Sequence, residues 1–259
     1  MAAQPVSAAW LNHSVTVVTA WNIRQGGGER APRIVDALVA TGADVAVLSE
    51  WRATSPNGLI DHLGNAGYVH TIRRPDPEGG YAAVLIASRL TIEPGTNHYE
   101  DVRDGHRFVE FRVAGVPHLI AGALIPGNQS DNDRKARFWQ YIVDEWAASV
   151  GNAPALLCGD LNTGLHYRDE LGATFTCSDQ MESLYRAGWR DGWIERNRSS
   201  RPPATWYSPG YENPFRLDHA ILSPRANRAR NVEYPTQIGD DHVLGPGGLS
   251  DHLPLVVTL

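Results

Sequence analysis

Acidic and imidazole side chains adjoin one another repeatedly in this chain, which suggests acid–base chemistry. The Asp-His pair occurs four times, at Asp61-His62, Asp218-His219, Asp241-His242 and Asp251-His252. A carboxylate bonded to an imidazole fixes its tautomer and stabilises its protonated form, as general acid or base catalysis requires. Two of the pairs adjoin apolar runs, in "RLDHAIL" and "SDHLPLVVTL". Strand ends present catalytic groups to a shared cleft, so these two are the better candidates.

Other polar residues end apolar runs in the same way. Asn22 and Glu50 end the first two runs, and Asp160 ends "APALLCGD" and is followed by Asn162. Taken singly, each has a structural explanation, such as a turn, an ion pair with a nearby arginine, or an Asx turn. In the same way, Asp218 could pair with Arg216.

Taken together, these residues indicate a buried polar cluster, because buried charge must be paired or bound to a metal. Carboxylate and amide oxygens suit a hard ion such as Mg²⁺ or Mn²⁺. Phosphodiester hydrolysis needs this set of groups: a metal to neutralise phosphoryl oxygens, an acid to activate water, and hydrogen-bond donors for the transition state.

Alternating strands and helices must position these groups. Apolar, β-branched runs predict strands, and amphipathic patterns with Pro or Gly at their ends predict helices. The predicted strands are 15–23, 44–50, 82–88, 106–114, 117–125, 153–160, 216–223 and 252–259, and the predicted helices are 29–42, 131–150 and 178–188. Two sheets packed face to face with helices outside would bury these runs, so we expect one α/β domain over 1–259, with 1–14 a loose N-terminal arm.

Composition narrows the class of protein. With 42% hydrophobic and 20% charged residues, the chain has the composition of a soluble globular protein. It shows no membrane-spanning run or signal peptide, and its two cysteines form no disulfide framework, so we expect a cytoplasmic protein. The net charge of −6 argues against a broad non-specific grip on nucleic acid. Of the 23 basic residues only Lys135 is a lysine, which coding bias or phosphate binding by arginine would explain equally.

Five motifs in order, "TAWNI", "LSE", "CGDLN", "RLDHAIL" and "LSDHLP", resemble the endonuclease/exonuclease/phosphatase superfamily. The chain is most similar to the branch that contains exonuclease III and the apurinic/apyrimidinic (AP) endonucleases, from about Val15 to Leu259. The resemblance implies a four-layered α/β/β/α sandwich, two packed mixed β-sheets flanked by helices, with a metal site at one edge of the paired sheets.

The resemblance also implies catalytic roles by position. His252 would contact the scissile phosphate and act as general acid or base, and Asp218, rather than the adjacent Asp251, would orient its imidazole. Asp160 would orient or deprotonate the attacking water, and Asn162 would donate its amide to the phosphate.

The metal and substrate positions follow from the same resemblance. Glu50 and Asn22 would hold Mg²⁺, with Mn²⁺ as an alternative, and Asp251 would make a second or outer contact. Arg107 matches an arginine near the metal region, although a surface hairpin position explains it equally. Trp206 falls where abasic-site enzymes place a pocket aromatic, with packing of a loop as the alternative.

Two departures bear on the substrate. Leu124 stands where the exonuclease III branch has a tyrosine that helps to hold the phosphate, and Asn128 is a hypothetical substitute. The motif around Glu50 reads "SEWR". Trp51 and Arg52 follow the glutamate, where the family usually has a glutamine at the first or second position.

These features favour a Mg²⁺-dependent phosphodiester hydrolase, a DNA nuclease of exonuclease or AP-endonuclease type. The acidic charge and Leu124 support an alternative, a phosphatase or phosphodiesterase for a small phosphorylated metabolite or phospho-adduct. A third reading is a catalytically degraded protein that binds nucleic acid or a partner through the same cleft. We expect DNA or another phosphodiester as partner, no membrane association, and a monomer.

Overall fold

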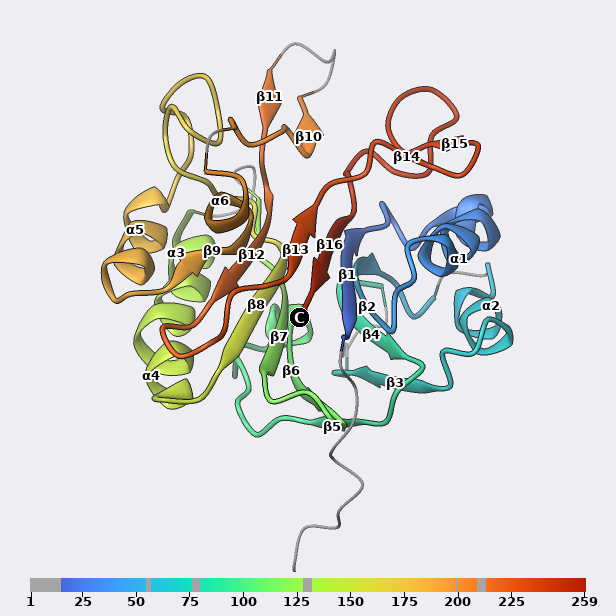
Figure 1. The fold of residues 1–259 in the computed structure, drawn as a ribbon, viewed down its shortest axis with the longest axis horizontal. Coiled ribbons are helices and arrows are strands. Elements are labelled where there is room, and N and C mark those ends of the chain that lie inside the picture. Colours follow the sequence, from blue (N-terminus) through green and yellow to red (C-terminus); the bar gives the residue numbers. More distant parts are fainter. Residues whose placement is uncertain (1–14, 55–56, 76–79, 128–131, 199, 209–212) are drawn as a thin grey trace, which may run out of the picture.

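Two six-stranded mixed sheets packed face to face form the centre of the molecule (Figure 1). The structure is a computed structural model that describes residues 15–259 apart from 55–56, 76–79, 128–131, 199 and 209–212. The expected N-terminal arm and Asn128 therefore lie outside the described residues.

The first sheet has the strand order β13-β16-β1-β2-β4-β3. β1 runs parallel to β2 and antiparallel to β16, so the two ends of the described chain meet in this sheet. In chain order its strands are β1 (Val17–Asn22), β2 (Val45–Trp51), β3 (His70–Arg73), β4 (Ala83–Ser88), β13 (Asn231–Glu233) and β16 (Leu255–Thr258).

The second sheet has the order β5-β6-β7-β8-β12-β9. β7 and β8 are parallel, and the other neighbours are antiparallel. Its strands are β5 (Ile92–Pro94), β6 (Phe108–Val113), β7 (Leu119–Leu124), β8 (Ala155–Asp160), β9 (Arg190–Asp191) and β12 (Asp218–Leu222). Two small hairpins extend from the same end of the sandwich: β10 (Trp206–Tyr207) with β11 (Pro214–Phe215), and β14 (Gln237–Ile238) with β15 (Asp241–His242).

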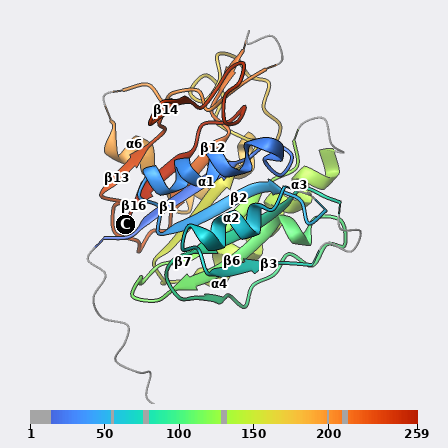
Figure 2. The same ribbon diagram turned by 90° about the vertical axis from the view of Figure 1, so that its right-hand side faces the viewer.

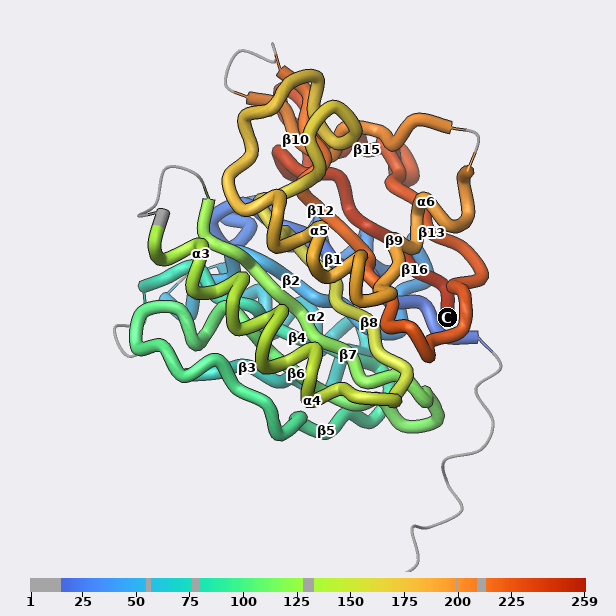
Figure 3. Tube along the Cα trace, turned by 90° about the vertical axis from the view of Figure 1, so that its left-hand side faces the viewer, coloured from blue at the N-terminus to red at the C-terminus, as the bar shows by residue number. Residues whose placement is uncertain are grey.

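Helices form the two outer layers and complete the predicted four-layered sandwich. Figure 2 shows α1 (Ala31–Ala40) and α2 (Leu59–Asn65) over the first sheet. Figure 3 shows the layer over the second sheet, made of α3 (Asn132–Gln140), a π-helical turn (Tyr141–Trp146), α4 (Ala147–Val150) and α5 (Ser178–Arg186). The short helix α6 (Gly192–Arg196) contacts β12 and β13, and 3-10 turns span Gly28–Arg30 and Gly105–Arg107. Among the described residues, no helix is both long and apolar enough to cross a bilayer.

Both faces of the central strands are covered, which explains why they read as continuous apolar runs. One apolar cluster fills the space between the sheets and continues beneath α1 and α2. Gly122 allows the two sheets close contact, because a Cβ there would lie 2.6 Å from Val47. A second cluster, with Phe108, Trp139 and Trp146, lies between the second sheet and its helices.

All eight predicted strands and all three predicted helices are present, with ends shifted by a few residues. The sequence does not predict the short edge strands β3, β5, β9 and β13, because two to four residues, most of them at least partly exposed, carry too little periodicity to identify a strand. The predicted helix over 131–150 contains the unpredicted π-helical turn, and its first residue lies outside the described part of the chain.

Candidate active site

Polar side chains from both sheets meet at one end of the sandwich. Asn22 ends β1, Glu50 lies in β2, and Asp160 ends β8. Asp218 begins β12 and pairs in register with Asp160. His252 precedes β16, on the segment that returns to β1. Sheet packing thus gathers five residues that are far apart in the sequence.

Asp160 depends on the glycine before it. Gly159 has φ +134°, and a Cβ there would lie 2.2 Å from the carbonyl oxygen of Ala123 on the neighbouring β7. Any other residue would push β8 away from β7. The glycine of the "CGDLN" motif therefore lets β7 and β8 pair up to Asp160.

A cleft of about 630 Å³ opens at this end of the sandwich. Of the predicted site residues, Asn22 and Asp218 are buried behind the cleft wall, and Asn128 lies outside the described residues. The others line the cleft, namely Glu50, Arg107, Asp160, Asn162, Trp206, Asp251 and His252.

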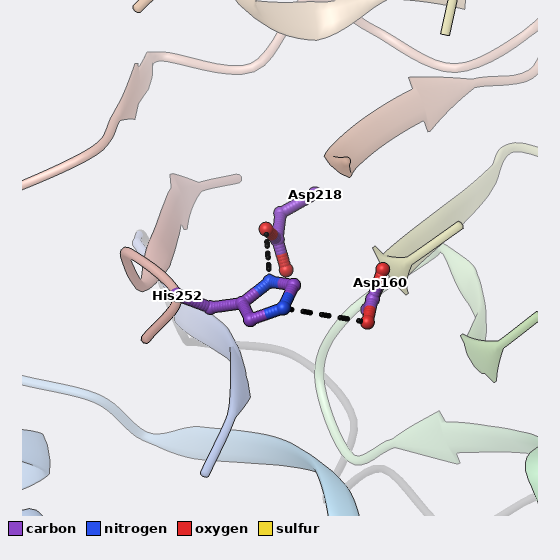
Figure 4. A group of neighbouring side chains, drawn as sticks. All are labelled: Asp160, Asp218 and His252. Carbon is purple, nitrogen blue, oxygen red and sulfur yellow. Dashed lines mark hydrogen bonds and ion pairs between the residues drawn. The ribbon is translucent and has the colours of Figure 1, made fainter. Parts of the chain in front are cut away.

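His252, which lines the cleft, forms a close acid–imidazole pair with Asp218 behind it. The Nδ1 atom of His252 lies 2.9 Å from Oδ2 of Asp218, and its Nε2 atom lies 3.9 Å from Oδ2 of Asp160 (Figure 4). Each ring nitrogen therefore faces a carboxylate. The prediction that Asp218, rather than Asp251, is the partner of His252 agrees with this geometry.

Electrostatics in this group favour a proton on His252. Burial opposes the imidazolium charge, but Asp218 and Asp160 outweigh burial and raise the pKa of His252 to about 10. Burial raises the pKa of Asp160, Asp218 raises it further, and His252 and the hydrogen bond from Asn22 offset part of the rise. The pKa of Asp160 is thus closer to that of a working general base than the pKa of an exposed aspartate would be.

Backbone contacts fix the position of His252. The Nε1 atom of Trp21 donates to the carbonyl of His252 at 2.9 Å. The Ser250 hydroxyl donates to the carbonyl of Asn22 at 2.6 Å and accepts from the backbone N–H of His252 at 3.3 Å. The serine of "SDH" thus ties the histidine segment to the end of β1.

Asn22 connects the acids of the two sheets. Its Nδ2 atom donates to Asp160 at 2.9 Å and to Glu50 at 3.1 Å, and its Oδ1 atom accepts from the backbone of Arg24 at 2.9 Å. The Oδ1 atom of Asn22 keeps a second lone pair, so its expected role as a metal ligand stays a prediction. In this arrangement its amide orients the two carboxylates.

Glu50 reaches the cleft through an irregularity in β2. The pairing of β2 with β4 shifts between Leu48 and Trp51, and Glu50 has φ +61°, a conformation that a non-glycine residue rarely adopts. One carboxylate oxygen accepts from Asn22 and the other from the backbone N–H of Gln25 at 2.7 Å. A carboxylate has about four acceptor positions, so both oxygens retain lone pairs for a cation.

The oxygen donors fit a hard divalent ion on the Glu50 side of the cleft. Glu50 and Asp251 both line the cleft, and the side chain of Asp251 is 40% exposed, with Arg24 at 3.8 Å. Asp160, Asp218 and His252 also lie close enough to share an ion. The imidazole of His252, however, lies between these two acids, and a proton on it offsets one of their two charges. We therefore place a candidate Mg²⁺ or Mn²⁺ site at Glu50, with Asp251 as the second carboxylate.

Asn162 occupies the turn that follows Asp160. Its φ is +45°, and its backbone N–H donates to Oδ1 of Asp160 at 3.0 Å. Its Nδ2 atom donates to the carbonyl of Ile125 at 2.9 Å. An amide NH₂ carries two hydrogens, so the second is available to a ligand in the cleft.

Two arginines bring positive charge to the cleft. Arg107 lines the cleft, although its place in the sequence fits a surface hairpin equally well. Its Nε atom lies 3.0 Å from the buried carboxylate of Asp104. Arg134 also pairs with Asp104. Arg52, which departs from the family pattern after Glu50, lines the cleft as well.

An apolar wall lies beside His252. Trp206 packs against Phe215 with ring centroids 5.8 Å apart, and Phe215 packs edge-on against Phe175 at 5.5 Å. The Trp206 ring lies 6.3 Å from that of His252, and the two residues form a β-bridge. Trp206 thus packs against a loop and lines the cleft, whereas Phe175 and Phe215 carried no motif that would have identified them.

A buried ion network behind the cleft was also missed. The side chain of Arg216 is 1% exposed, donates to Asp169 at 2.7 Å and pairs with Asp191. Arg216 lies two residues before Asp218, the first residue of β12, and Asp169 belongs to the loop that carries Phe175. The alternative explanation that Asp218 pairs with Arg216 is not seen among the described ion pairs.

Known proteins share this fold. A family model for the endonuclease/exonuclease/phosphatase family matches residues 19–252. The chain resembles an AP endonuclease from Archaeoglobus fulgidus, with a TM-score of 0.76 and 18% identity over 93% of this chain and 98% of that one. It also resembles two structures titled as NExo, a 3' phosphatase from Neisseria bound to a product DNA hairpin (TM-score 0.77, 16% identity) and a 3'-5' exonuclease from Neisseria meningitidis (0.76, 17%), each over 93% of this chain and 98% of that one.

No curated protein matches the chain by sequence. At 16–18% identity, the solved structures show the fold alone. The family model covers most of the chain, including the Asn22, Glu50, Asp160, Asp218 and His252 positions. The chain therefore belongs to the endonuclease/exonuclease/phosphatase family of phosphoester-cleaving hydrolases.

Proposed function

We propose that this protein is a divalent-metal-dependent phosphodiester hydrolase that acts on DNA. The observation that carries the proposal is the order Asp218–His252–Asp160, in which one imidazole lies between two buried carboxylates at the edge of a cleft. A protonated His252 and an ionised Asp160 are the acid and base that hydrolysis of a phosphodiester requires.

Each residue has a distinct role in the proposed reaction. Asp160 accepts a proton from the water that attacks phosphorus, and His252, held protonated by Asp218, donates a proton to the ester oxygen that leaves as its bond to phosphorus breaks. Asn162 donates its free amide hydrogen to a non-bridging oxygen. A Mg²⁺ or Mn²⁺ ion bound by Glu50 and Asp251 would neutralise charge on the phosphoryl oxygens. Asn22 keeps Glu50 and Asp160 oriented toward the same phosphate.

The walls of the cleft support a nucleic-acid substrate. Arg52 and Arg107 bring positive charge to the cleft of an acidic protein. The wall of Phe175, Trp206 and Phe215 provides aromatic faces for a base or sugar. The similar structures named above include an AP endonuclease and an enzyme bound to a DNA hairpin. Their activities are consistent with DNA as the substrate class.

Leu124 favours a second candidate function, hydrolysis of a small phosphoester. It pairs with Asp160 across β7 and β8 and lines the cleft, where a hydroxyl would reach the substrate. A smaller substrate would need fewer phosphate contacts. The non-catalytic reading has less support, because Asp160, Asn162, Asp218 and His252 are all retained in one arrangement.

A substrate panel separates these functions. The protein is incubated with Mg²⁺ or Mn²⁺ and with labelled duplex, single-stranded and abasic DNA, a generic phosphodiester and a small phosphomonoester. The proposal expects metal-dependent cleavage of at least one DNA, faster than cleavage of either small ester. Cleavage of only the small esters would overturn the DNA assignment, and no cleavage above a His252→Ala control would support the binding-protein reading.

A further inference from the structure

Lys135 is the only lysine among the 23 basic residues of the chain, and it is completely buried. It lies on α3, which packs over the second sheet behind the candidate active site. Long basic side chains are rarely fully buried unless their charge meets a specific partner. Because every other basic residue of the chain is arginine, we looked for contacts of Lys135 that a lysine makes better than an arginine.

The Lys135 ammonium contacts the catalytic turn. Its Nζ atom donates to the backbone carbonyl of Asn162 at 2.6 Å. One helical turn later on the same face, Nε1 of Trp139 donates to the Thr163 hydroxyl at 2.9 Å. Two side chains of α3 thus hold consecutive residues of the segment that follows β8.

This segment has an unfavourable backbone conformation that must be held in place. Asn162 lies in the left-handed region, with φ +45°, where non-glycine residues are uncommon. Its N–H orients Asp160, and its side chain lines the cleft. A shift of its carbonyl would therefore move both the Asp160 carboxylate and the Asn162 amide.

An ammonium group suits this position better than a guanidinium. It is compact and can donate three hydrogen bonds in different directions, whereas a guanidinium is a wide planar fork. Burial lowers the pKa of Lys135 to about 8, and nearby Cys177 and Asp160 limit that fall. At neutral pH the group is protonated, so it brings a positive charge close to Asp160.

We propose that Lys135 is a positioning residue, which holds the Asn162 turn and through it the Asp160 carboxylate in the geometry needed for hydrolysis. The proposal rests on the proposed function, because it assigns Asn162 and Asp160 to catalysis. It predicts that Lys135 affects the rate of the chemical step rather than substrate binding.

Kinetics of Lys135→Met test this role, with Arg137→Met, on the exposed face of the same helix, as the matched loss of charge. We expect kcat of Lys135→Met to fall roughly 10- to 100-fold with KM nearly unchanged, as for a small misplacement of catalytic groups. Lys135→Arg, which keeps the charge and donors, should recover part of the loss, and Arg137→Met should behave as wild type. An unchanged kcat, or a rise in KM alone, would overturn the proposal.

A double-mutant cycle tests whether Lys135 acts through the Asp160 carboxylate. In an Asp160→Asn background, Lys135→Met should lower kcat by much less than it does in the wild type, because coupled residues do not contribute additively. An equal loss in both backgrounds would overturn the proposal, because Lys135 would then act independently of Asp160.

The single lysine also allows a test that needs no activity. In protein labelled with ¹⁵N-lysine, one side-chain ammonium signal arises, and its hydrogen bond should protect it from exchange at pH 6. The signal should shift in Asn162→Gly and stay in place in Arg137→Met. An unprotected signal would refute the contact even if the enzyme is active. A protected signal in a protein that cleaves no phosphoester would instead refute the proposed function and leave the Asn162 contact established.

Discussion

Nδ1 of His252 lies 2.9 Å from Oδ2 of Asp218, although the two residues are 34 positions apart in the sequence. The adjacent Asp251 faces Arg24 and the cleft. The pair that the chain places side by side is therefore not the pair that makes the hydrogen bond. Packing of β12 beside β8, and of the His252 segment against β1, creates the functional contact.

Asp218→Asn should lower kcat roughly 10²- to 10⁴-fold, the usual contribution of a general acid or base. Because the charge of Asp218 raises the pKa of both His252 and Asp160, its loss should also move both limbs of the pH–rate profile to lower pH. Asp61→Asn, in an exposed Asp-His pair on α2, is the matched control. A profile that keeps its wild-type limbs would contradict the assigned dyad.

The wild-type enzyme should have an alkaline optimum in its pH–rate profile. Asp160 must be ionised, and its pKa is raised, so activity should increase with pH through a value well above the ordinary ~3.9 of an aspartate. His252 must be protonated, and its pKa of about 10 means that this requirement fails only at high pH. Rates measured from pH 5 to 10.5 at saturating metal test this, and a maximum below pH 6 would count against it.

Glu50→Gln should weaken binding of Mn²⁺ and Mg²⁺ by at least 10-fold, since even residues that only orient metal ligands contribute roughly 10- to 100-fold. Isothermal titration with Mn²⁺ measures the change without any substrate. Glu93→Gln, on the exposed edge strand β5, provides a matched loss of charge. If Glu50→Gln binds the ion as tightly as Glu93→Gln, the metal lies elsewhere in the cleft.

Arg216→Met should destabilise the fold by roughly 3–5 kcal/mol, because it removes the buried partner of Asp169 and Asp191 and leaves these two acids only the partly exposed Arg168. Burial opposes their ionisation, but Arg216 outweighs it and lowers the pKa of both acids. Their stabilisation is therefore present above about pH 4 and lost as the pH falls. Urea unfolding at pH 7 and pH 3.5, with exposed Arg225→Met as control, measures both effects. Equal stability of the two variants would refute the network's role.

Trp206→Ala should reduce kcat/KM for DNA more than for a generic phosphodiester. Stacking of a base on an aromatic ring contributes about 1–3 kcal/mol, and a substrate without a base lacks this contact. The ratio of kcat/KM for the two substrates is the relevant measurement. An equal loss on both would mean that Trp206 supports His252 through their β-bridge rather than binding DNA.

The sequence could predict the parts of the fold that repeat a physical pattern. Central strands such as β1 and β8 are covered on both faces, so they read as continuous apolar runs, and the polar residues that end them identify the candidate site. The pairing of Asp218 with His252 follows only from resemblance to a family, because local periodicity does not encode which distant segments pack together.

The parts that sequence reasoning missed depend on long-range contacts. Phe175 and Phe215 form the apolar wall only because their loops pack together, and Arg216 reads as an ordinary charge until Asp169 and Asp191 are brought to it. The role of Asn22 as a metal ligand stays a prediction from the sequence, and only the structure shows its hydrogen bonds to Asp160 and Glu50.

In the proposed reaction, Asp160 and the His252–Asp218 pair carry out metal-dependent hydrolysis of a phosphodiester. The most direct measurement is the rate of hydrolysis of a generic phosphodiester with Mn²⁺, with and without excess chelator, by the wild type, Asp160→Asn and His252→Ala. We predict that the chelator abolishes the wild-type rate and that each substitution lowers it roughly 10²- to 10⁴-fold with the fold intact. A rate that survives the chelator, or variants that match the wild type, would contradict the claim.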